Sequence, residues 1–270
     1  MTHATAYKLT FMQKLLGRNY KWWYATLYNF KLSYEFRLSI FIAIVRFFIP
    51  VFITYILLSL TNSNKSFSNY TVIASIYYQF FAFVVGPSFD ITNDVLKGSF
   101  SRYLLYPIDY LNFLWTKIIG FNLLTLIFRL IILFITIAIL SISFNWLNFI
   151  YTAPFIALTI FIGYQMDKLI GIQVFFQQQL NKNLIAFYYD LMPFLSGSLL
   201  AFSISSYLEG FKFTPMAYFA YHPMQIYLGK YDFNQTLMVF AGGIAWCVVL
   251  YFLAKWIFKM GLKRNEAVGL

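Results

Sequence analysis

Long apolar runs alternate with short polar segments along most of the chain. A helix needs about 20 apolar residues to cross a bilayer, because lipid offers no partner for an unpaired backbone group. Six runs meet this length, and the fourth can continue to Phe176. The pattern predicts an all-α polytopic membrane protein with six transmembrane helices. We place these spans at 36–60, 70–89, 118–140, 148–166, 184–206 and 236–258.

Two further segments flank or interrupt this array. Residues 1–35 mix aromatics and leucines with lysines at helical spacing, and Trp22 and Trp23 are adjacent. Tryptophan prefers the headgroup level, so we expect an amphipathic interfacial N-terminal helix; a plain solvated helix before the first span is the alternative. Pro215 and Pro223 interrupt an apolar stretch between spans five and six, which predicts a short re-entrant or interfacial helical segment. We therefore divide the chain into an interfacial helix at 1–35 and a six-span domain at 36–270.

Composition supports a membrane protein and orients it. Hydrophobic residues make up 61% of the chain and charged residues 11%, against about 25% charged in soluble domains. The formal net charge of +11 comes from basic residues that flank apolar runs, which favours the positive-inside rule over nucleic-acid binding. Of the 20 Lys and Arg residues, only Lys65, Lys212 and Lys230 fall on the side opposite the termini. We expect both termini to be cytoplasmic.

The loop after the second predicted span combines charged and apolar side chains around Gly98. This composition suits docking into a groove on a partner protein, and an ordinary interfacial loop is the alternative. No GxxxxGK[ST] motif occurs in the chain, so any energy from ATP has to come from another polypeptide. The charged residues are Asp94, Lys97 and Arg102, and the apolar ones are Phe100, Tyr103, Leu104 and Leu105.

Three stretches resemble the bacterial ABC type-2 transporter permeases, in the order in which that family has them. The loop resembles the family's connection between spans two and three. The segment after span five resembles another family pattern, and the tail at 261–269 resembles the ending G-x-K-R-Y-E-A-x-G, with Asn265 where an aromatic is commoner. The matching residues are Asp90-Ile91, Lys97-Gly98, Tyr103-Leu104-Leu105, Pro107-Ile108, Gly197, Pro215, Tyr221-His222-Pro223 and Tyr227-Leu228-Gly229-Lys230.

The resemblance implies a permease subunit of a bacterial plasma-membrane ABC exporter, with no catalytic site and no cofactor of its own. Two permease chains, identical or different, would form the substrate pathway, surrounded by membrane lipids. A separate ATPase subunit would bind ATP and Mg²⁺. The family's loop carries the coupling helix that contacts this ATPase. Carried over to this chain, the coupling residues are Asp94, Lys97, Gly98, Arg102, Tyr103 and Leu105.

Charged residues inside the predicted spans are candidates for the pathway. Arg129 lies 12 residues beyond Lys117, about 18 Å along a helix, where an unpaired arginine costs at least ~2.5 kcal/mol. Asp190 is the only carboxylate well inside a predicted span. We predict that Arg129 pairs with Asp190 or lines the pathway, and a pair that only fixes helix packing is the alternative. Arg46 also lies in a span but can snorkel towards the interface.

Two other function classes are alternatives to a permease subunit. An ATP-independent channel would need a filter-like loop, and the segment from Pro215 to Gly229 is the only candidate. A membrane-embedded lipid-modifying enzyme would need a cluster of catalytic side chains within the spans, and no histidine lies in one. His3 and His222 are far apart and have no metal-binding context, so we expect no metal site.

Overall fold

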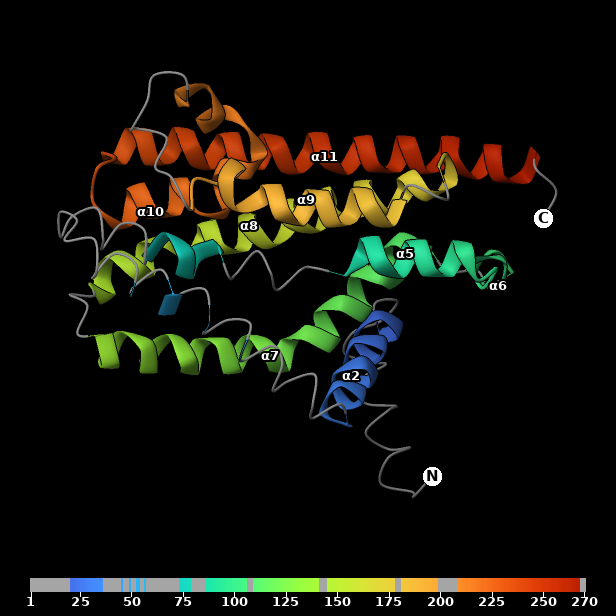
Figure 1. The fold of residues 1–270 in the computed structure, drawn as a ribbon, viewed down its shortest axis with the longest axis horizontal. Coiled ribbons are helices and arrows are strands. Elements are labelled where there is room, and N and C mark those ends of the chain that lie inside the picture. Colours follow the sequence, from blue (N-terminus) through green and yellow to red (C-terminus); the bar gives the residue numbers. More distant parts are fainter. Residues whose placement is uncertain are drawn as a thin grey trace.

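A computed structural model describes residues 20–35, 45, 49, 52–53, 56, 73–78, 86–105, 109–140, 145–177, 181–198 and 208–267. Every regular element within these ranges is helical, as the sequence predicts (Figure 1). The α-helices are α2 (Tyr20–Glu35), α5 (Pro87–Leu96), α6 (Phe100–Leu104), α7 (Tyr110–Leu140), α8 (Trp146–Ile172), α9 (Asn181–Leu195), α10 (Tyr221–Tyr227) and α11 (Phe233–Ala267). The 3₁₀-helices are η3 (Gln173–Phe175), η5 (Glu209–Phe213) and η6 (Pro215–Phe219).

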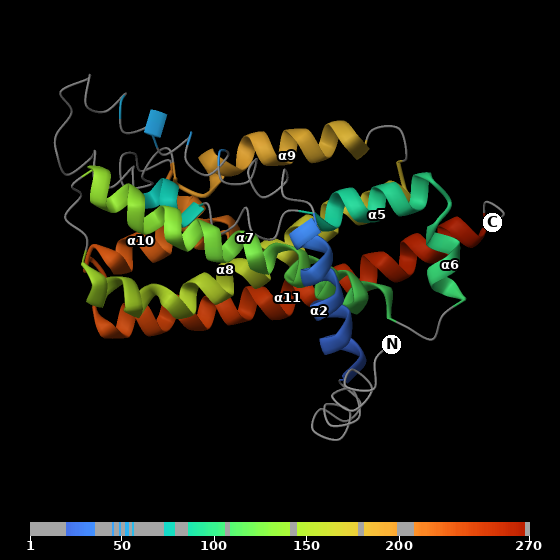
Figure 2. The same ribbon diagram turned by 90° about the horizontal axis from the view of Figure 1, so that it is seen from below.

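Three long helices, α7, α8 and α11, run along the long axis of the molecule (Figures 1 and 2). Within the described residues, two segments are long and apolar enough to cross a membrane: Trp146–Phe175, which joins α8 to η3, and Phe233–Arg264 in α11. They correspond to predicted spans four and six. Helix α7 contains predicted span three, and α9 covers the first half of span five. Most of spans one and two lies outside the described residues, so the count of six stays a prediction.

Side-chain caps explain where the long helices begin. Asn145 accepts hydrogen bonds from the backbone N–H groups of Leu147 and Asn148 at the start of α8. Asp109 likewise accepts two backbone N–H groups at the start of α7. Asp232 accepts from the N–H of Gln235 at the start of α11. Each cap satisfies backbone donors that have no partner inside the helix.

Helix α2 lies across α7 rather than along it (Figure 2). Gly120 of α7 permits this crossing, because a Cβ at that position would overlap the carbonyl oxygen of Thr26. Trp23, Tyr24 and Tyr28 of α2 are exposed. The helix predicted within 1–35 is therefore present over residues 20–35; its position in the membrane interface stays a prediction, and residues 1–19 lie outside the described part.

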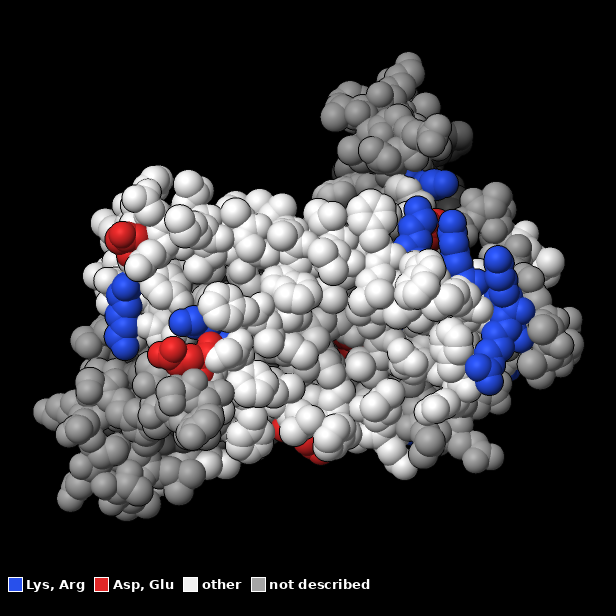
Figure 3. All heavy atoms as spheres, turned by 90° about the horizontal axis from the view of Figure 1, so that it is seen from above, with Lys and Arg blue, Asp and Glu red and all other residues white. Residues whose placement is uncertain are grey.

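The two ends of the molecule differ in charge. Figure 3 shows a middle that is largely uncharged apart from a few acidic atoms, with most of the visible Lys and Arg at the end where α11 finishes. The last turns of α11 carry Lys255, Lys259, Lys263 and Arg264. The positive-inside rule predicts that this end is cytoplasmic, and it is also the end that carries α5 and α6 (Figure 1).

A packed group of short helices occupies the opposite end, which the same rule predicts to be the outer end and where the sequence predicts a re-entrant or interfacial segment. Every residue of α10 is buried. The backbone N–H of Asn145 donates to the Tyr227 hydroxyl at 2.8 Å, which ties α10 to the start of α8. His222 lies 2.8 Å from the carbonyl oxygen of Lys212 through Nε2 and 3.2 Å from the Tyr231 hydroxyl through Nδ1. The segment is helical, as predicted, and α10 packs inside the protein.

Candidate functional site

The loop after the second predicted span forms two helices, α5 and α6, which we call the α5–α6 unit. Gly86, with φ of 151°, adopts a conformation that favours glycine, and Pro87 then occupies the first turn of α5. Phe89 belongs to α5, so the prediction that span two runs to residue 89 is wrong at its C-terminal end. The reason is local: the Gly-Pro pair breaks the helix before the apolar pattern ends.

A buried carboxylate from α8 holds the N-terminus of α5. The Asp167 side chain is completely buried. It accepts hydrogen bonds from the Ser88 backbone N–H and hydroxyl, both at 2.9 Å, and from the Gly86 N–H at 3.2 Å. The Tyr189 hydroxyl of α9 donates to the same carboxylate. Because helix N-termini favour negative charge, this arrangement fixes α5 to both α8 and α9.

Helices α5 and α8 also approach each other closely. A Cβ at Gly171 would come within 2.7 Å of the Ser88 Cα atom, so only glycine allows this packing. On the other side of α5, the Lys117 ammonium of α7 lies 2.9 Å from the Asp90 carboxylate. The side chains of this ion pair are 37% and 29% exposed. Three helices outside the unit therefore contact α5 directly.

Side-chain hydrogen bonds and ring packing fix the turn from α5 to α6. Gly98 has φ of 70°, and Asp94 accepts hydrogen bonds from the Ser99 hydroxyl at 2.9 Å and the Tyr110 hydroxyl at 2.8 Å. Phe100 is 1% exposed and packs edge-on against Tyr110 and other rings. The remaining contacts to Phe100 come from Phe175 of η3 and Phe258 of α11. This aromatic cluster joins α6 to α7, η3 and α11.

The predicted coupling residues divide into two groups in the structure. Asp94 is half-buried and binds Ser99 and Tyr110, and Tyr103 packs against the rings of Tyr110 and Phe113. Lys97, Gly98 and Leu105 face solvent. The side chain of Arg102 lies outside the described residues, although its backbone belongs to α6.

Two exposed residues that the sequence did not single out lie on the same unit. Phe89 is 46% exposed and Leu96 is 42% exposed, while Leu105 is 85% exposed. Phe89 and Leu96 are seven residues apart on α5, which places them on one face of the helix. Residues 89, 93 and 96 have helical spacing in the sequence. Because the second span is predicted to end at residue 89, this spacing is not assigned to one helix there. The unit therefore presents apolar side chains beside Lys97.

The predicted intramembrane pair is not brought together by described atoms. Asp190 is exposed on α9 and forms no ion pair with any residue whose side chain is described. Arg129 belongs to α7, but its side chain lies outside the described residues, as does Arg46. The pairing of Arg129 with Asp190 therefore stays a prediction.

A second carboxylate, Asp167, also belongs to a long apolar helix. Helix α8 continues to Ile172, so Asp167 and Lys168 belong to it rather than to a loop. Both residues are buried. The sequence allows the fourth span to continue to Phe176, and this longer range includes both charges.

Comparison with known protein families gives one match. The model of a family described as "ABC-2 family transporter protein" matches residues 47–269. This range includes the α5–α6 unit, α7, α8 and α11. Searches of curated proteins and of solved structures give no match for this chain.

Proposed function

Because the chain belongs to the ABC-2 family of transporter proteins, and is thus a membrane permease subunit of an ABC transporter, we propose that it is an exporter subunit driven through the α5–α6 unit. Two permease chains form the pathway, and a separate ATPase that binds ATP and Mg²⁺ docks on the cytoplasmic end. Spans one, two and five form the dimer interface in this proposal. The membrane is the bacterial plasma membrane, with both termini in the cytoplasm.

The exposed face of the α5–α6 unit supports docking of the ATPase there. We define the docking surface as Phe89, Leu96, Lys97 and Leu105. Three of these four side chains are apolar and exposed at the basic end of the molecule. Apolar side chains surrounded by polar ones on a helix suit insertion into a groove of a partner protein.

The anchors behind this surface support transmission of force. Asp167 joins α5 to α8, and Lys117 joins it to α7. Phe100 joins α6 to α11 through Phe258. A displacement of the docking surface would therefore move three long helices together, because packed elements transmit strain rather than absorb it. The connection of an exposed apolar surface to α7, α8 and α11 is the observation that carries the proposal.

The experiment is co-purification of the tagged permease with its ATPase from membranes, after substitution of Leu105 or Leu96 with Asp. Each change places a charge on the docking surface, and we expect at least about tenfold less ATPase bound, as for a residue central to an interface. Phe213→Asp is the matched control, because Phe213 is 73% exposed at the outer end. The control should retain the ATPase.

Two results would contradict the proposal. Normal ATPase recovery with both Leu96→Asp and Leu105→Asp would place the docking surface elsewhere. Equal loss with Phe213→Asp would show that any exposed charge disturbs the complex. Transport in vesicles that contain the purified permease without an ATPase would favour the channel hypothesis instead.

A further inference from the structure

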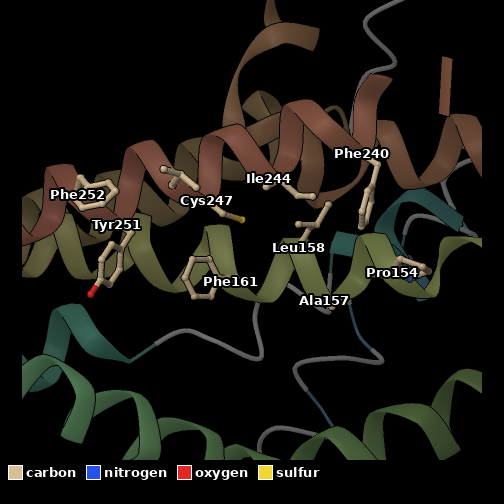
Figure 4. Close-up of a pocket in the computed structure, with 10 residues that line it drawn as sticks. Pro154, Ala157, Leu158, Phe161, Phe240, Ile244, Cys247, Tyr251 and Phe252 are labelled. Atoms are coloured by element: carbon tan, nitrogen blue, oxygen red, sulfur yellow. The ribbon is translucent and has the colours of Figure 1, made fainter. Parts of the chain in front are cut away.

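An apolar groove lies between α8 and α11, the two candidate membrane-spanning helices (Figure 4). Its volume is about 480 Å³. Figure 4 shows side chains from both helices directed towards the space between them. The lining includes Ala157, Leu158 and Phe161 of α8 together with Ile244, Cys247 and Phe252 of α11. A groove of this composition accepts a hydrocarbon chain.

A smaller polar pocket of about 200 Å³ continues the groove towards the cytoplasmic end. Phe161 and Tyr251 line both cavities, so the two adjoin. On α8 the polar lining residues Gln165 and Lys168 follow the apolar ones, and on α11 Lys255 follows them. Both helices therefore change from apolar to basic in the same direction, towards the inner membrane surface.

The pocket contains polar atoms that have no hydrogen-bond partner among the described residues. Lys168 is 3% exposed, and it makes no hydrogen bond or ion pair with any described residue. Its ammonium lies 5.1 Å and 5.9 Å from the ring centroids of Tyr164 and Tyr251. The Oε1 atom of Gln165 is buried and has no hydrogen-bond partner among the described residues. A buried ammonium calls for an anion, and a buried carbonyl oxygen calls for a donor.

The charges around the pocket define the ligand further. Lys168 and Lys255 contribute two positive charges, and Asp109 contributes one negative charge. One oxygen of Asp109 already accepts the N–H groups of Leu111 and Asn112 at the start of α7. The pocket therefore carries a net positive charge, which complements a singly charged phosphodiester.

We propose that the groove and pocket together bind an anionic glycerophospholipid of the inner leaflet. The phosphodiester lies at Lys168 and Lys255, a headgroup hydroxyl donates to Gln165 Oε1, and one acyl chain follows the groove. The length agrees: Phe240 to Tyr251 spans about 16 Å of helix, close to the roughly 15 Å hydrocarbon thickness of one leaflet. The site does not depend on ATPase docking, so it can fail or hold independently of the proposed function.

The test is native mass spectrometry of the purified full-length protein, with phosphatidylglycerol or phosphatidylcholine of the same chain length added in detergent. We expect phosphatidylglycerol to bind at least about tenfold more tightly, and Lys168→Met to remove this preference. Lys259→Met is the control, because Lys259 lies one turn beyond Lys255 on α11 and does not line the pocket. The control should bind like the wild type.

A second variant separates a lipid from a soluble anion. Ala157→Trp fills the apolar groove without touching the polar pocket, and Ala153→Trp places the same side chain on an exposed part of α8 outside the groove. We expect only Ala157→Trp to weaken phosphatidylglycerol binding, and we expect glycerol phosphate alone not to bind. Equal binding of the two lipids, unchanged binding in both Lys168→Met and Ala157→Trp, or tight binding of glycerol phosphate would each overturn the proposal.

Discussion

The α5–α6 unit and the segment from η6 to α10, which we call the outer segment, are held by different kinds of contact. The unit combines the buried ring of Phe100 with charged contacts, those of Asp167 and the Lys117–Asp90 pair, and it leaves Leu105 85% exposed. The outer segment buries every residue of α10 and uses neutral contacts, such as that of His222 with the Lys212 carbonyl. One end therefore leaves apolar side chains on its surface, as the proposed docking of an ATPase requires, and the other packs against its own bundle.

The largest expected change in stability concerns Phe100, the aromatic anchor of the α5–α6 unit. Phe100→Ala removes a ring that is 1% exposed and that contacts Tyr110, Phe175 and Phe258. We expect a loss of about 3–5 kcal/mol in unfolding free energy, from lost burial and the cavity left behind. Chemical unfolding in mixed micelles measures it. Leu105→Ala, on the same unit but exposed, should change stability by less than about 0.5 kcal/mol.

Acid should weaken the outer segment through His222. The carbonyl of Lys212 can only accept a hydrogen bond, so Nε2 carries the proton and Nδ1 accepts from the Tyr231 hydroxyl. Burial lowers the pKa of His222 from 6.5 to about 4. The folded state therefore resists protonation, and its stability falls as the pH drops from about 6.5 to 4, by roughly 3 kcal/mol in total.

The measurement is unfolding of the wild type and His222→Gln across this pH range. Glutamine keeps a donor and an acceptor but does not titrate, so the difference between the two curves isolates the imidazole from neighbouring carboxylates such as Glu209 and Asp232. Parallel curves would show that His222 is not protected in the folded protein.

Removing the charge that holds α5 should have a smaller effect on stability. Asp167→Asn keeps the shape of the side chain but places an amide opposite donors from Gly86 and Ser88. We expect a loss of about 2 kcal/mol, because hydrogen bonds to ionised groups exceed neutral ones. Glu209→Gln is the control, since this carboxylate is 59% exposed and pairs with Lys212 at 3.9 Å. Equal effects of the two substitutions would remove the distinction between buried anchor and surface pair.

The sequence predicts the long helices well because their apolar runs are local signals. Helices α8 and α11 and the short helical segment between spans five and six follow from hydrophobicity and from the positions of proline. The Asp167 cap could not be predicted in this way, because it joins residues 79 positions apart. The same holds for the inward turn of Asp94, which depends on Tyr110 of another helix. Contacts of this kind are set by tertiary packing, and spacing along the chain does not encode them.

The smallest expected effect concerns the Lys117–Asp90 pair, and it tests whether the unit needs this second ionic contact. The two side chains are about one-third exposed, so solvent screens their attraction at 2.9 Å. A double-mutant cycle with Lys117→Met and Asp90→Asn should give a coupling energy of about 0.5–1 kcal/mol. High salt should reduce this coupling but leave the effect of Asp167→Asn unchanged, because buried pairs are screened less than exposed ones. A salt-insensitive coupling above about 2 kcal/mol would instead make Lys117 an anchor equal to Asp167.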